Sequence, residues 1–243
     1  MTTATTNQLN LQGVTEPARA GVTELADVLR QFLGDDFSAL TVFGAAVTTD
    51  FGPRARIRTV AVLKNVHVAG LAKMAPKGPH LGRHRLEAPL IVTPQYVTES
   101  LDAFPVEFLE IHQVHHTVLG PDIFADLEFH SQHMRLQCER EFKRMLIRLR
   151  QGILAAAGKV SQLGELLDDL SGHGARVLRG VLWLHGDRRP LAPHSLWDEA
   201  GRFLKLNLSA ADRTPGSGGP PTIADVERVY HTLEQLAEKV NAL

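Results

Sequence analysis

The sequence predicts an α+β protein in which an N-terminal mixed β-sheet with flanking helices is followed by a C-terminal helical bundle. Two short apolar, β-branched runs at residues 40–43 and 59–63 flank a connection that contains Gly-Pro, which is typical of strands joined by a turn. Beyond residue 126 the composition changes and apolar residues recur at helical spacing. We therefore expect a disordered tail at 1–15, an α/β domain at 16–126 and a helical bundle at 127–243, with a flexible linker at 211–221.

The composition excludes several classes of protein. The chain has 243 residues, enough for two modest domains with full cores, and its net charge of -1 argues against general coating of nucleic acid. Cys138 is its single cysteine, so we expect a cytoplasmic protein without structural zinc. The N-terminus lacks the basic and apolar regions of a secretory signal, and no apolar run is long enough to span a membrane.

Periodicity and chain breakers place the N-terminal elements. Apolar residues recur every three or four positions from Glu16 to Leu33, and Gly34 follows as a helix stop. The expected elements after this helix are strands at Leu40–Phe43 and Ile57–Leu63, a turn at Gly44–Ala46, a strand at Pro89–Thr93, a short helix at Pro94–Phe104 and a fourth strand at Val106–Ile111.

The segment from Val66 to Glu87 differs in kind, because glycines and prolines interrupt it and its charges are mostly basic. We interpret it as an exposed basic loop. Two roles remain open for it, a solvated connection and a contact for an anion or phosphate. Its cations are Lys73, Lys77, Arg83 and Arg85.

The C-terminal part is expected to be helical throughout. An apolar stripe predicts one long helix at about 127–157, and a Thr-x-x-Asp start at Thr222 predicts the last helix. Between them we expect helical segments at Val160–Leu170 and Ala175–Leu184, separated by Gly172-His173-Gly174, and another at Ser195–Leu206.

Five stretches carry a family resemblance. Gly44-Ala45 stands in the first turn, Asp50-Phe51-Gly52-Pro53 follows, and residues 54–63 form the next strand with its entry. Further on, residues 105–111 precede Thr117-Val118-Leu119-Gly120. This pattern resembles the DNA polymerase β-like nucleotidyltransferase superfamily, especially its small bacterial members. The resemblance implies a fold built for Mg²⁺-dependent nucleotidyl transfer.

The residues that carry the chemistry in that family are altered here. Family members have Gly-Ser in the turn and Asp-x-Asp at the start of the strand, whereas this chain has Ala45 after Gly44, and Arg56 and Arg58 in place of the acids. A guanidinium stays protonated and has no lone pair for a cation. By the same match Glu107 takes the third carboxylate position. We predict that it pairs with Arg56 or Arg58; in the alternative, the arginines are exposed and Glu107 faces solvent.

Five histidines lie close together in the sequence and raise the question of a metal. They are His112, His115, His116, His130 and His133. No carboxylate accompanies them at a dedicated spacing, so we expect ordinary surface or packing histidines and predict no metal ligand.

Three arginines, Arg140, Arg144 and Arg148, repeat every four residues along the expected long helix. Like charges at this spacing repel unless anions face them. One interpretation is an inter-helix ion-pair network with Glu165, Asp168 and Asp169. The other is that this stripe and the basic loop line a cleft for an anionic ligand.

These observations favour a pseudoenzyme without metal-dependent transfer or cofactor, which binds a nucleotide-like or other anionic ligand or a protein partner. One alternative is an active nucleotidyltransferase that holds Mg²⁺ through Asp50, Glu107 and Glu110, and another is a structural or homo-oligomeric protein. The candidate ligand-binding residues are Arg56, Arg58, Lys73, Lys77, Arg83, Arg85, Arg140, Arg144 and Arg148.

Overall fold

The computed structural model describes residues 8–49, 51–53, 55–213 and 221–243. The chain divides into two compact units, Met1–Leu101 with Glu110–Glu128, and Asp102–Leu109 with Phe129–Leu243. The elements are α1 (Glu16–Leu33), η1 (Gly34–Asp36), β1 (Phe37–Phe43), η2 (Gly44–Val47), β2 (Arg58–Leu63), α2 (Val68–Met74), η3 (Ala75–Lys77), α3 (Gly78–Arg83), β3 (Leu90–Val92), α4 (Pro94–Glu99), α5 (Pro105–Gln113), β4 (His115–Leu119), α6 (Ser131–Ala156), α7 (Val160–Leu184), α8 (Pro193–Leu204) and α9 (Ile223–Asn241).

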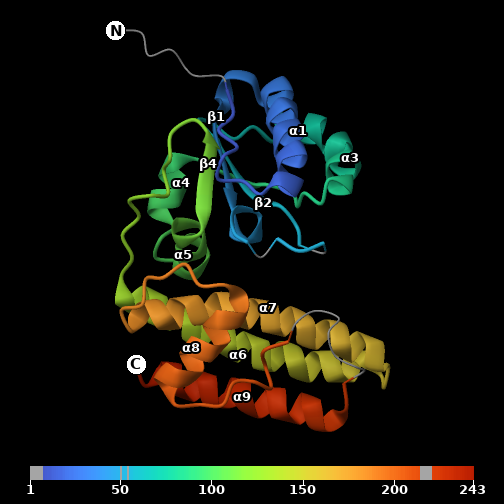
Figure 1. The fold of residues 1–243 in the computed structure, drawn as a ribbon, viewed down its shortest axis with the longest axis vertical. Helices are drawn as coiled ribbons and strands as arrows, with labels where there is room; N and C mark the ends of the chain where they lie inside the picture. The colour runs from blue at the N-terminus through green and yellow to red at the C-terminus, as the bar shows by residue number, and fades with distance from the viewer. Residues whose placement is uncertain (1–7, 50, 54, 214–220) are drawn as a thin grey trace. The chain divides into compact units, whose positions relative to one another are not determined.

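The first unit is built on a mixed sheet with the strand order β3-β2-β1-β4. The central strand β1 runs antiparallel to β2 and β4, while β3 runs parallel to β2. Leu40 and Val42 point to one face by the two-residue period of a strand, and they pack against α1 and Leu81 of α3. Figure 1 shows α1 and α3 on this face. The predicted mixed sheet with flanking helices is therefore confirmed.

The expected strand at Val106–Ile111 is wrong, because this segment lies in helix α5. Pro105 at the first helical position suits a helix start. Val106 and Leu109, three residues apart, are both buried in the core of the second unit, which is helical spacing. Short apolar runs do not distinguish strand from helix by periodicity alone. The fourth strand is instead β4, which begins at His115 just after the end of α5.

Two further segments are more helical than the sequence predicts. The basic segment at 66–87 is not a simple loop, since it forms α2, η3 and α3, in which the prolines occupy first-turn positions that tolerate them. The segments at 160–170 and 175–184 are one continuous helix, α7. A side-chain carbon at Gly174 would lie 2.7 Å from the Trp197 ring, so this glycine lets α8 approach α7 closely.

The chain ends also differ from expectation where they are described. Residues 8–15 are not a free tail, because Val14 is buried and Leu9 and Leu11 pack against the core of the first unit. Residues 1–7, and residues 214–220 of the expected linker, lie outside the described residues. Arg213, just before that gap, pairs with Asp168 at 3.0 Å.

The second unit has a core formed by α6, α7, α8 and α9, and the apolar stripe predicted for the long helix is buried at Phe142, Met145 and Leu149. Thr222 and Asp225 form the predicted capping box at the start of α9. Cys138 is fully buried, and burial raises the pKa of its thiol far above the ordinary value. No helix among the described residues is long and apolar enough to cross a membrane.

Candidate functional site

The candidate site lies where β1 ends and β2 begins. The antiparallel register places Phe43, the last residue of β1, opposite Arg58, the first residue of β2. The chain then turns at Gly44, whose φ of +73° favours glycine. The Gly44 N–H donates to the carbonyl oxygen of Val114, the residue before β4, at 2.9 Å. This hydrogen bond holds the turn against the start of β4. The Gly44-Ala45 turn and Arg58, which the family pattern links, are thus neighbours.

Arg58 forms a two-point ion pair with Glu110. Its Nη1 donates to Oε1 at 2.7 Å and its Nη2 to Oε2 at 2.9 Å. The Arg58 side chain is 28% exposed and that of Glu110 is 10% exposed. The guanidinium carbon lies 4.3 Å from the centre of the Phe43 ring, and a side-chain carbon at Gly44 would lie 3.6 Å from Nη1. The guanidinium therefore fills the space between the turn, the ring and the carboxylate.

The predicted pairing of Glu107 with Arg56 or Arg58 is wrong, because the carboxylate that binds Arg58 lies about one helical turn further along α5. Glu107 instead accepts a hydrogen bond from Gln137 Nε2 at 2.6 Å, and Gln137 Oε1 accepts the Val106 N–H at 2.8 Å. Glu110 lies three residues further along α5, which is about 4.5 Å along a helix axis. Arg58 is thus paired with a carboxylate, but that carboxylate belongs to Glu110 and not to the predicted Glu107. Arg56 is exposed and forms no ion pair with the described residues.

The four strands of the described sheet carry no aspartate or glutamate. The neighbour of β2 away from β1 is β3, whose residues are Leu90, Ile91 and Val92. An acid on that strand would lie close to β2, because neighbouring strands are about 4.8 Å apart. Asp50, an acid of the active-enzyme alternative, lies outside the described residues. The described sheet therefore offers no carboxylate for Mg²⁺.

Several of the predicted ligand-binding cations already have internal partners. Arg85 donates to the carbonyl oxygens of Gly52 and Pro53 at 3.0 and 3.1 Å and stacks on Phe51. Arg83 donates to His80 Nδ1 at 2.6 Å. Arg144 pairs with Glu141 of the same helix, while Arg148 pairs with Asp169 of α7, and this is the one ion pair of the expected inter-helix network found among the described residues. Of the predicted ligand-binding cations, those that are exposed and have neither an ion pair nor a side-chain hydrogen bond with the described residues are Arg56, Lys73, Lys77 and Arg140.

The arginine stripe and the basic segment belong to different units. Whether they line one cleft stays a prediction.

The five clustered histidines make separate contacts. His112 Nδ1 bonds to the Phe124 carbonyl oxygen at 2.8 Å, and His116 Nε2 bonds to the Asn10 carbonyl oxygen at 2.9 Å. His115 Nε2 lies 2.9 Å from Asp122. Burial alone would raise the pKa of Asp122, but its hydrogen bonds with His115 and the Phe124 N–H outweigh burial and hold that pKa below its ordinary value. The rings of His130 and His133 meet edge to face at 5.6 Å.

The fold with this strand-turn-strand hairpin is that of the DNA polymerase β-like nucleotidyltransferases. A solved structure that matches is spectinomycin adenyltransferase AAD(9) from Enterococcus faecialis with ATP and spectinomycin. The two share 8% sequence identity with a TM-score of 0.59, and the match covers 92% of this chain and 99% of that chain. At this identity the likeness shows the fold alone. No protein-family model and no curated protein sequence matches the chain.

Proposed function

We propose that this chain is a binding protein with a nucleotidyltransferase fold that does not catalyse Mg²⁺-dependent nucleotidyl transfer. The observation that carries the proposal is the two-point ion pair between Arg58 and Glu110 at the start of β2. Both carboxylate oxygens of Glu110 are engaged, and the fixed positive charge of Arg58 repels a divalent ion at this position.

The pair is supported by Phe43 at the end of β1 and by the turn at Gly44. Phe43 covers one face of the guanidinium, and Gly44 lies against one of its nitrogens. Opening this arrangement for a metal would leave a mostly buried carboxylate and a guanidinium without partners, which costs several kcal/mol when buried charges are separated. The described residues around Arg58 therefore offer no site for the two bridging cations of nucleotidyl transfer.

The proposed ligand is a nucleotide-like or other anionic small molecule that binds without a metal. In the first unit Arg56, Lys73 and Lys77 are exposed and have no ion pair among the described residues, so they are free to attract phosphate or carboxylate groups. The solved structure that the chain resembles contains ATP, which makes nucleoside triphosphates the first probes.

Calorimetric titration with nucleoside triphosphates, with and without Mg²⁺, tests this proposal. We expect binding that is the same in both conditions and that weakens in the variant Arg56→Ala/Lys73→Ala/Lys77→Ala. Lys239→Ala, an exposed cation of the second unit outside the candidate ligand-binding residues, is the control and leaves binding unchanged. Binding that requires Mg²⁺ would overturn the proposal, and complete absence of binding would favour a protein partner over a small anion.

One observation favours the alternative of an active transferase. The chain shares its fold with a protein named as an adenyltransferase, and Glu110 places one carboxylate beside the start of β2. Catalysis there requires Arg58 to leave Glu110. Release of pyrophosphate from ATP that is abolished by Glu110→Gln would support this alternative against ours.

A further inference from the structure

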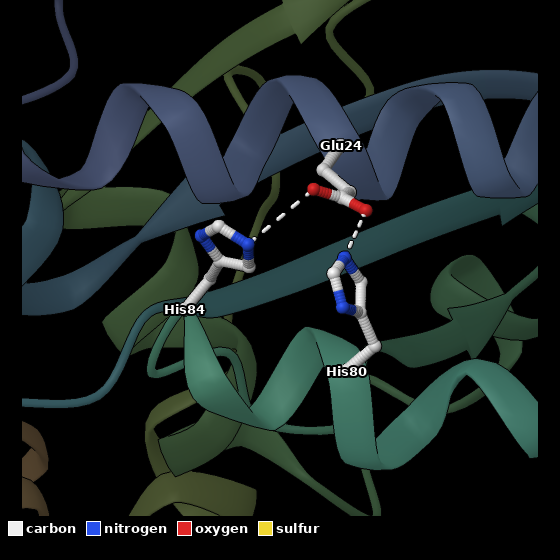
Figure 2. Close-up of side chains that lie close together, drawn as sticks. All are labelled: Glu24, His80 and His84. Atoms are coloured by element: carbon white, nitrogen blue, oxygen red, sulfur yellow. Dashed lines mark hydrogen bonds and ion pairs between the residues drawn. The ribbon is translucent and has the colours of Figure 1, made fainter.

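A carboxylate and two imidazoles meet on the helix-covered face of the sheet in the first unit. Glu24 lies on α1, His80 on α3, and His84 directly after α3. Figure 2 shows both imidazoles directed at the carboxylate of Glu24 from the neighbouring helix. One potential ligand atom of each residue lies within 4.8 Å of those of the other two. Among the described residues no other three His, Cys, Asp or Glu side chains come this close.

The two histidines engage different oxygens of the carboxylate. His80 Nε2 is hydrogen-bonded to Glu24 Oε1, and His84 Nε2 lies 3.4 Å from Oε2. The two rings stand edge to face with their centres 5.4 Å apart. The spacing of four residues is one helical turn, which puts both rings on one side of the backbone. Two nitrogens and a carboxylate oxygen thus converge from two elements.

The surrounding packing fixes this convergence. Leu81, between the histidines, is buried against the core that contains Leu25 and Leu29 of α1. Gly21 lies one turn before Glu24, and a side-chain carbon there would lie 3.1 Å from His84 Cβ. The absence of a side chain at Gly21 therefore lets the His84 backbone come close to α1. The donor positions are set by the fold and do not depend on flexible surface contacts alone.

The donor set matches one class of ion. Imidazole nitrogens with a carboxylate oxygen suit Zn²⁺ and related transition-metal ions, whereas Mg²⁺ prefers oxygen ligands. Ligands about 2.0–2.1 Å from a tetrahedral ion stand about 3.3 Å apart, and the His84 to Glu24 separation of 3.4 Å is already close to this value. The side chains are 35–43% exposed, so an ion can enter and a water can complete the coordination.

Arg83 contacts the ring nitrogen of His80 that faces away from Glu24. Its guanidinium donates to His80 Nδ1 at 2.6 Å, so that nitrogen accepts and Nε2 carries the proton shared with Glu24. A metal ion at Nε2 displaces this proton, and Nδ1 must then become a donor. Arg83 is exposed and can turn away. Its positive charge opposes metal binding, which provides a specific test.

We propose that Glu24, His80 and His84 form a Zn²⁺ site with two nitrogen ligands, one carboxylate oxygen and a water. The ion replaces the proton between His80 and Glu24 and links α3 to α1. This inference is independent of the proposed function, because it involves neither Arg58 nor the exposed cations of the anion site.

Calorimetric titration of the full chain with Zn²⁺ tests the site. We expect one ion per chain, and a dissociation constant at least tenfold weaker in His80→Ala/His84→Ala and in Glu24→Gln. The matched control is His130→Ala/His133→Ala, which removes a second pair of edge-to-face imidazoles, 5.6 Å apart, that has no third ligand among the described residues. Binding in the control should equal that of the unaltered chain.

A second measurement does not depend on the folding of any variant. Co²⁺ added to the unaltered chain should give visible absorption bands of a four-coordinate ion, and one equivalent of Zn²⁺ should abolish them. Absence of stoichiometric Zn²⁺ binding by the unaltered chain would overturn the proposal. So would binding that survives in folded His80→Ala/His84→Ala, since the ion would then lie elsewhere.

Discussion

Two carboxylates of the first unit face basic partners, and the difference between them determines where a metal can bind. Glu110 is held at both oxygens by Arg58, at 2.7 and 2.9 Å. Glu24 is approached at its two oxygens by His80 and His84. An arginine keeps its proton and offers no lone pair, whereas an imidazole can exchange a proton for a metal ion. We therefore expect Glu110 to be closed to cations and Glu24 to be open to them.

The largest effect expected is the loss of stability in Glu110→Ala. This substitution leaves the Arg58 guanidinium, which is 28% exposed, without its carboxylate. We expect the free energy of unfolding to fall by about 2–3 kcal/mol, somewhat less than for a fully buried pair. Urea denaturation followed by circular dichroism measures it.

The variant Arg58→Met/Glu110→Leu is the control for this result, because it removes both charges together. It should recover at least half of the loss, since apolar side chains can replace such a pair at little cost. If Glu110→Ala is as stable as the unaltered chain, the ion pair does not close the site.

A charge reversal at β2 should turn the closed site into a cation site. In Arg56→Asp/Arg58→Asp the Asp-x-Asp spacing of the family returns, with Glu110 as a third acid nearby. For a dissociation constant of about 1 mM, 10 mM Mg²⁺ should stabilise this variant by about 1.4 kcal/mol. Thermal unfolding with and without Mg²⁺ measures the gain, and Arg58→Met should show none.

The affinity of the Glu24 site for Zn²⁺ should depend on the positive charge of Arg83 beside it. Arg83→Ala removes the guanidinium from His80 Nδ1, so Zn²⁺ should bind about three- to tenfold more tightly. Calorimetry measures the change, and Arg140→Ala serves as the control. Weaker Zn²⁺ binding in Arg83→Ala would mean that the guanidinium supports the site, which is the opposite of the expected repulsion.

The smallest effect concerns Arg85, which directly follows His84. It has a left-handed φ of 63° and donates to the carbonyl oxygens of Gly52 and Pro53. Arg85→Gly loses the donor but gains a favourable backbone, whereas Arg85→Ala loses the donor and keeps the strain. The glycine variant should be more stable than the alanine variant by about 1 kcal/mol in denaturant unfolding. Equal stabilities would show that the backbone there is unstrained.

Local patterns predicted the mixed sheet, the long helix and the capped last helix, because each depends on periodicity and capping within one segment. The same patterns failed at α5, where six apolar and acidic residues fit either a strand or a helix until their packing partners are known. They failed again inside α7, where the sequence predicts a helix break that includes Gly174. Its lack of a side chain instead makes room for the Trp197 ring of α8.

At the candidate site the sequence predicted an arginine paired with a carboxylate, but it did not identify which carboxylate. Arg58 follows from the altered Asp-x-Asp motif, while the choice of Glu110 over Glu107 depends on the helix that carries them. The Glu24 cluster had only a weak signal, two histidines four residues apart in a segment interrupted by glycine and proline. Its third member is 56 residues away in sequence, so only the fold reveals it.

Binding of Mn²⁺ tests the central claim, that Arg58 closes the cation position beside β2, most directly. Free Mn²⁺ should be measured by electron paramagnetic resonance in two samples, one with ATP alone and one with ATP and the His80→Ala/His84→Ala variant. This variant lacks the other proposed cation site. We expect that this variant takes up no more Mn²⁺ than ATP alone, and that Arg56→Asp/Arg58→Asp in the same background takes up additional ion. Stoichiometric Mn²⁺ binding by His80→Ala/His84→Ala that disappears in the further variant Glu110→Gln would contradict the claim.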